Sequence, residues 1–282
     1  MTNFEKGVKV FAITLAVVII ASIVTTLLGV LDFTGRIIGG RDENDNHIKE
    51  EYYPENDEDD DFTDEEEIAK RVTKLEIDLK ATSLKIYEGD KFKVEKYDTD
   101  DKVYFKNEDG TLKIKEKEYH FWDSNGGTIV IYIPKDHSVR KLDVEMGAGK
   151  AVIEGIDIAK LDFEQGAGSL TIDSCSFDET EIEGGAGKIV IEDSRLRNLD
   201  LESGVGSVDI QAHILGSSKI KSGIGSLKVK LMGNKDDYSI SAKKGIGSLQ
   251  IDGTSDLNTY GSGSNYLKVD GGTGSVRIDF EE

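Results

Sequence analysis

The fold is decided by a short stretch, GAGKAVIEG at residues 147–155, which returns six more times along the chain. The later copies read GAGSLTID at 166–173, GAGKIVIED at 185–193, GVGSVDI at 204–210, GIGSLKV at 223–229, GIGSLQID at 245–252 and GTGSVRID at 272–279. The first glycines of successive copies are 19, 19, 19, 19, 22 and 27 residues apart. A repeat of about 20 residues is typical of solenoid proteins, in which each repeat forms one coil.

Apolar residues fill the same positions in every copy. They stand three residues before the first glycine (Val144, Phe163, Ile182, Leu201, Ile220, Ala242, Val269), four after it (Ala151, Leu170, Ile189, Val208, Leu227, Leu249, Val276) and six after it (Ile153, Ile172, Ile191, Ile210, Val229, Ile251, Ile278). Because they alternate with polar residues, each coil is predicted to contain two short strands with one buried face.

A tight corner is expected between the two strands of each coil. It requires glycine if the backbone there has a positive φ. The predicted turn glycines are Gly147, Gly149, Gly166, Gly168, Gly185, Gly187, Gly204, Gly206, Gly223, Gly225, Gly245, Gly247, Gly272 and Gly274. The residue between each pair is Ala148, Ala167, Ala186, Val205, Ile224, Ile246 or Thr273, and we expect it to fill the corner from inside.

The same alternation extends back to residue 72, as in Ile129, Ile131 and Ile133, and no segment beyond residue 72 sustains a helical period. The sequence therefore predicts an all-β, single-domain parallel β-solenoid over residues 72–282, with coils of about 19 residues. Extra residues at 231–238 and 253–265 are expected to bulge out as loops. With coils stacked in chain order, the C-terminal coil leaves an open edge, which either its terminal acidic residues guard or a second molecule pairs with.

The N-terminal quarter of the chain has a different character. Residues 10–31 carry no charge over 22 residues, which as a helix spans about 33 Å, the thickness of a bilayer core. We expect a single-pass signal anchor there, after a short cytoplasmic tail at 1–9. Between residues 42 and 67 there are 15 acidic residues against one lysine, so 32–71 is expected to be a disordered, acidic stalk.

Overall charge excludes some classes of partner. The 282 residues include 55 acidic and 35 basic side chains, giving a net charge of −20, which argues against nucleic acid as a ligand.

The single Cys175 excludes an intramolecular disulfide and a multi-cysteine metal site, and is expected to be a small buried residue. The glycine motifs lack the spacing of a phosphate-binding loop, and the histidines lack metal-ligand spacing. The sequence indicates no catalytic residue, cofactor or metal.

The residues that would contact a ligand are expected where the repeat is irregular. Polar segments that carry aromatic residues suit contacts with glycans or proteins. The candidates are Tyr238, Tyr260, Tyr266 and Trp122.

The repeated segments, together with IVIYIP at 129–134, resemble the putative adhesin family of bacterial β-strand-repeat proteins, a domain of unknown function. The resemblance covers residues 72–282 and implies a β-helix-like domain, often membrane-anchored, in the bacterial cell envelope and without established catalytic residues. It favours a non-enzymatic, adhesin-like or envelope-interaction module outside the cell membrane, with a glycan or protein ligand. One alternative is a cytosol-facing structural polymer that associates through the C-terminal coil; another is a polysaccharide-active β-helix enzyme.

Overall fold

The structure is a computed structural model that describes residues 49–52, 71–99, 102–117 and 126–281. All of these belong to one compact unit, His47–Glu282, and the other unit of the chain is Met1–Asn46. The predicted membrane anchor at 10–31 and most of the predicted stalk therefore lie outside the described residues. Within the part that is described, no helix is long and apolar enough to cross a membrane.

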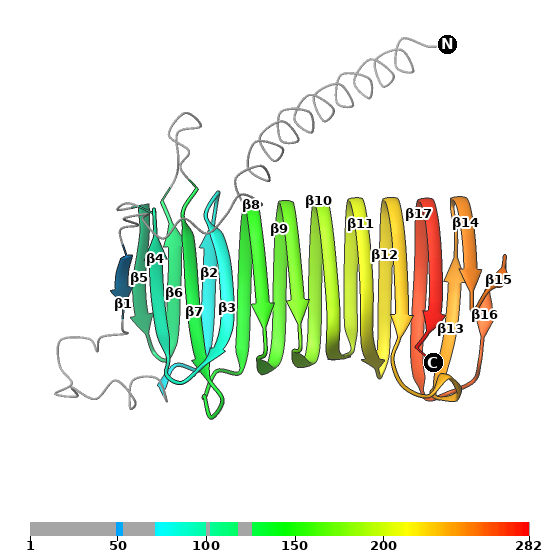
Figure 1. Cartoon of the computed structure of the whole chain (residues 1–282), viewed down its shortest axis with the longest axis horizontal. Coiled ribbons are helices and arrows are strands. Elements are labelled where there is room, and N and C mark those ends of the chain that lie inside the picture. Colours follow the sequence, from blue (N-terminus) through cyan, green and yellow to red (C-terminus); the bar gives the residue numbers. More distant parts are fainter. Residues whose placement is uncertain (1–48, 53–70, 100–101, 118–125, 282) are drawn as a thin grey trace, which may run out of the picture. The chain divides into compact units, whose positions relative to one another are not determined.

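All the described strands belong to one sheet, which confirms the all-β prediction (Figure 1). They are β1 (Lys49–Tyr52), β2 (Lys74–Leu79), β3 (Ser83–Gly89), β4 (Lys93–Tyr97), β5 (Val103–Glu108), β6 (Thr111–Glu116), β7 (Thr128–Pro134), β8 (Lys141–Glu154), β9 (Asp157–Asp173), β10 (Ser176–Arg197), β11 (Leu199–Leu215), β12 (Ser217–Leu231), β13 (Tyr238–Lys243), β14 (Ile246–Ile251), β15 (Thr254–Ser255), β16 (Thr259–Tyr260) and β17 (Asn265–Phe280). A short 3-10 turn, η2 (Lys235–Asp237), joins β12 to β13. Strand β1 falls within the range expected to be stalk and pairs antiparallel with β4.

The regular part of the solenoid runs from β8 to β12, each strand pairing in parallel with the next. The register follows the repeat, with Ile172 opposite Ile153, and Ile210 opposite Ile191. Each long strand bends at its Gly-x-Gly corner into two arms, whose apolar side chains face a shared interior. Every residue of the three predicted apolar columns is buried, at most 5% exposed. The predicted register is therefore confirmed.

The order of the last two coils differs from the prediction. Strand β17 pairs with β12 on one side and with β13 and β14 on the other, so the last coil in sequence lies inside the stack. The expected open edge at the C-terminal coil is wrong, and that coil offers no free edge for a second molecule. The two insertions explain the difference. The segment with the η2 turn carries the chain from β12 past the neighbouring place in the stack to β13, and the segment with β15 and β16 returns the chain to that place, where it forms β17.

The N-terminal end has a similar rearrangement. The coil formed by β2 and β3 pairs with β8 on one side and with β6 and β7 on the other. The coil formed by β2 and β3, which comes first in the sequence, is therefore the second coil from the N-terminal end of the stack. Beyond it, β5 pairs antiparallel with β6 and β4 pairs antiparallel with β7, and these strands cover edges that would otherwise be exposed.

The corners depend on glycine for two separate reasons. The second glycine of each pair has a positive φ, +145° at Gly187, and a Cβ there would overlap the carbonyl oxygen of Gly168 in the preceding coil. The first glycine is required by close approach, since a Cβ on Gly166 would lie 2.7 Å from the carbonyl oxygen of Gly147. The predicted turn role of these glycines agrees with this geometry.

The residue between the glycines does not fill the corner from inside, as was expected. Val205 is 38% exposed, Ile224 57% and Ile246 77%. Side chains of a strand point alternately to its two faces. The residue four positions after the first glycine is buried, so the two glycines, two and four positions before it, also lie on the inner side, where the neighbouring carbonyl leaves no room for a side chain. The middle residue therefore falls on the outside.

Candidate functional site

Two of the four predicted ligand contacts are packing residues. The side chain of Tyr238 is buried, and its hydroxyl donates a hydrogen bond to the carbonyl oxygen of Met232 at 2.7 Å. Burial raises the pKa of Tyr238. The ring of Phe280 lies between Tyr238 and Tyr260, with centroid distances of 6.0 and 5.0 Å. This aromatic cluster closes the core next to the insertions, so Tyr238 is not available to a ligand.

Tyr266 does not join this cluster. Tyr266 is 42% exposed near the start of β17, opposite Ser217 and Ser239 of the flanking strands. Trp122 lies outside the described residues. The ligand contacts at Tyr266 and Trp122 stay predictions.

The thiol of Cys175 is buried, as the sequence predicted. Its Sγ lies 3.1 Å from the carbonyl oxygen of Asp173. Burial raises the pKa of this thiol to about 11, so at neutral pH it remains protonated and a poor nucleophile. In the described part of the chain, no three His, Cys, Asp or Glu side chains are grouped so as to hold a metal ion.

The surface is organised by columns of charge. On the first arm of each coil, the two outward positions nearest the corner lie four and two residues before the first glycine. On β8 to β11 all eight are acidic: Asp143, Glu145, Asp162, Glu164, Glu181, Glu183, Asp200 and Glu202. Glu76 and Asp78 of β2 extend these columns in register. We call these ten residues the acidic face. Like charges side by side on adjacent strands, about 4.8 Å apart, destabilise a sheet.

A shallow groove of about 350 Å³ runs along the acidic face beside the corners of β9, β10 and β11. Three glutamates, Glu164, Glu183 and Glu202, line it across the three coils. Gly184 and Ser203 also line the groove, in the position directly before the first glycine of their coils. In the coil of β9 the same position holds Gln165, which also lines the groove and whose Nε2 donates a hydrogen bond to the carbonyl oxygen of Gly149 at 2.9 Å.

The charge changes sign abruptly after β11. The equivalent positions on β12 are Lys219 and Lys221, and β12 as a whole has four lysines and no acidic residue. The boundary is bridged by ion pairs, from Lys221 to Glu202 and from Lys219 to Asp200 at 3.9 Å. The hydrogen bond from Lys221 lowers the pKa of Glu202. We call β12, β17, β13 and β14 the basic end.

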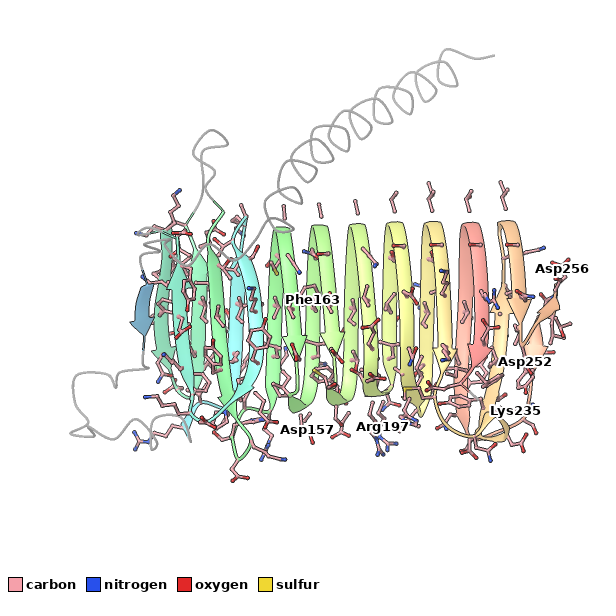
Figure 2. The ribbon with its side chains drawn as sticks, in the orientation of Figure 1. Asp157, Phe163, Arg197, Lys235, Asp252 and Asp256 are labelled. Atoms are coloured by element: carbon pink, nitrogen blue, oxygen red, sulfur yellow. The ribbon has the colours of Figure 1, made fainter. Side chains whose placement is uncertain are left out.

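The Gly-x-Gly corners form a third surface, which we call the corner edge. It comprises five residues in each of seven coils, from the one before the first glycine to the one after the second. These residues include three lysines, Lys150, Lys188 and Lys244, and no acidic residue, in a chain with a net charge of −20. Figure 2 shows a row of side chains standing off the coils along this edge. Both this pattern and that of the acidic face are visible in the repeat columns of the sequence, but they lie outside the motifs and irregular segments in which ligand contacts were predicted.

The comparisons with known proteins come from structures and from a family model. The sequence matches none of the curated proteins. A putative cell adhesion protein from Clostridium sporogenes is similar in structure, with 15% identity, a TM-score of 0.40, and coverage of 83% of this chain and 100% of that one. A putative adhesin from Bacteroides fragilis has 13% identity, a TM-score of 0.48, and coverage of 85% and 100%. The model of the Toastrack DUF4097 family matches residues 71–262. The chain therefore belongs to the Toastrack DUF4097 family.

Proposed function

We propose that this protein is a non-enzymatic, adhesin-like interaction module of the bacterial cell envelope. In this proposal, residues 10–31 anchor the chain in the cell membrane, 32–71 form a spacer, and the solenoid is displayed outside the cell. The acidic face is the surface that contacts the ligand, which is a cationic envelope polymer or protein.

The in-register stacking of the acidic face carries this proposal. Carboxylates occupy the two outward positions nearest the corner on β2 and on four further successive coils. Lysines pair with six of the ten carboxylates. Among the described residues, no ion pair is made by the other four, Glu145, Glu164, Glu181 and Glu183, so like charges on adjacent strands repel each other there. A cationic ligand lying across the coils would relieve that repulsion. The groove beside Glu164, Glu183 and Glu202 offers room for such a ligand along the stack.

Binding without turnover is favoured by the chemistry of the described side chains. The one thiol, Cys175, is buried and has a pKa of about 11. The carboxylates of the acidic face stand on flat strand arms that repeat from coil to coil, so no position is distinguished as an acid or a base. An extended charged surface of this kind suits recognition of a polymer or of a protein surface.

The test of the acidic face uses two matched variants of the full chain. Glu164→Gln with Glu183→Gln removes two charges beside the groove, and Glu154→Gln with Glu192→Gln removes two from the second arms of their coils. All four side chains are exposed, so both variants should keep the wild-type melting temperature within a few degrees. Sedimentation with isolated bacterial cell envelopes, with decalysine as competitor, should show weaker binding only for the first variant. Equal binding by both variants would reject the acidic face as the contact surface.

Display outside the cell has a separate test. Asn56→Cys places a second thiol in the proposed spacer, and the buried Cys175 serves as an internal control that should remain unlabelled. A membrane-impermeant maleimide should label Asn56→Cys in intact cells. Labelling only after lysis would place the domain in the cytosol and rule out an adhesin-like role.

A further inference from the structure

Exposure of the apolar residues on the corner edge rises toward the basic end. In spatial order the strands are β11, β12, β17 and β14, and their middle residues are Val205, Ile224, Thr273 and Ile246. The exposed fractions of the three apolar ones are 38%, 57% and 77%. Single exposed apolar residues are common, but a row of large aliphatic side chains on adjacent coils is a feature of interaction surfaces.

The same end carries the positive charge. Residues 238–251, which contain β13 and β14, include Lys243 and Lys244 and no acidic residue, while the charges of β17 balance. Lys243 is exposed and has no ion pair among the described residues, and Lys244 pairs with Asp256. Ile246 therefore stands close to Lys243 and Lys244, and Ile224 follows Lys221 on β12. Asp270 of β17 lies in register between Lys221 and Lys243 and pairs with Lys268 at 3.5 Å.

From this arrangement we infer that the corner edge of the basic end docks on an anionic lipid surface. Ile224, Thr273 and Ile246 enter the headgroup layer side by side, and Lys243 contacts lipid phosphates. Lys221 and Lys244 exchange their ion pairs with Glu202 and Asp256 for contacts with lipid phosphates. Apolar side chains flanked by lysines are the combination that binds anionic membrane interfaces. The inference does not depend on the acidic face or its ligand.

The geometry of the edge suits insertion as a unit. Coils are about 4.8 Å apart, so Ile224 and Ile246, two positions apart, stand about 10 Å from each other. The backbone beneath them is held by stacked glycines, whose carbonyl groups leave no room for a side chain. The two isoleucines therefore enter the interface without the cost of ordering a loop.

Other occupants fit this surface less well. A ridge one residue wide is far smaller than the roughly 800 Å² per partner of a stable dimer interface, and a second copy would bring lysines close to lysines. A soluble anionic polymer would satisfy the lysines but would leave Ile224 and Ile246 exposed to water. An anionic bilayer satisfies both groups.

The experiment follows a fluorescent probe on the full chain. Ser248→Cys labelled with NBD places the probe beside Ile246 on the exposed corner of β14, and Asp236→Cys with the same label is the control in the η2 turn. Buried Cys175 stays unlabelled in both. With vesicles of phosphatidylcholine and phosphatidylglycerol, the Ser248 probe should shift to the blue and brighten, and the Asp236 probe should not. With phosphatidylcholine alone, neither should change, although any membrane anchor would insert into both kinds of vesicle.

Variants of the edge give the quantitative test. Each of the substitutions Lys243→Gln and Lys244→Gln should raise the lipid concentration that gives half of the maximal NBD signal about fivefold at low salt. Ile224→Ser should raise it about tenfold. Circular dichroism melts should show that each variant remains folded. The inference is overturned if the Ser248 probe does not respond to anionic vesicles, or responds equally to phosphatidylcholine. It is also overturned if polyphosphate without lipid gives the same blue shift.

Discussion

Replacing one corner glycine by alanine tests why the corners need glycine. Gly206 has a φ of +144°, and a Cβ there would overlap the carbonyl oxygen of Gly187 in the preceding coil. The unfavourable backbone conformation costs about 1–3 kcal/mol, and crowding against the neighbouring coil costs about 1–3 kcal/mol more. For a domain of this size, each kcal/mol lowers Tm by about 2–4 °C. Gly206→Ala should therefore lower Tm by about 5–20 °C.

Gly253→Ala is the matched control, because it separates backbone conformation from crowding. Gly253 has a φ of +73°, and a Cβ there would meet nothing within 4 Å. Only the cost of the left-handed conformation remains, about 1–2 kcal/mol, or about 2–8 °C in Tm. Thermal melts followed by circular dichroism compare the two variants. If Gly206→Ala melts no lower than Gly253→Ala, the close stacking of glycines does not limit the corner, and the reasoning is refuted.

Three further predictions concern the core, the thiol and an ion pair. Ile210→Asp places a carboxylate among apolar side chains at a fully buried position, so the variant should lose its cooperative melt; a wild-type melting curve would contradict the register. Cys175 should react with a maleimide at pH 7 only after denaturation, and rapid reaction of the folded chain would contradict its burial. Hydrogen bonds from Lys106 and Lys113 lower the pKa of Glu108 to about 2, below its unfolded value of about 4.3, so these two ion pairs stabilise the fold above pH 4.3 and less as the pH falls toward 2. The difference in Tm between wild type and Glu108→Gln should shrink over that range, and a constant difference would reject the ion pairs.

The inward columns could be predicted because burial leaves a period in the sequence. Each position three before, four after and six after the first glycine must hold an apolar residue of suitable size, whatever its neighbours in the stack. A coil therefore reveals its own register. Its place in the stack leaves no such trace, because β17 would show the same columns at the end of the stack as it does between β12 and β14.

The outward position of Val205, Ile224 and Ile246 was missed for a different reason. Apolar character was taken as a sign of burial, although on the second arm the alternation counted back to the corner already places the middle residue outside. The prediction for Tyr238 was wrong for the opposite reason. Tyr238 lies in a polar segment, but its ring packs on Phe280, a contact between residues far apart in sequence that no local pattern predicts.

The two rearranged ends explain why a repeat with identical edges need not polymerise. Coils of one shape could add to one another without limit, but at the N-terminal end β4 and β5 run antiparallel across the last coil and interrupt that pattern. At the other end, β15 and β16 cover only parts of β13 and β14, pairing with Ile240, Ser241, Gln250 and Ile251. On the outer side of residues 243–248, the described chain provides no paired strand, and all six are exposed. Lys243 and Lys244 oppose pairing with a second strand there, so the part of the stack left uncovered is also the part suited to an anionic surface.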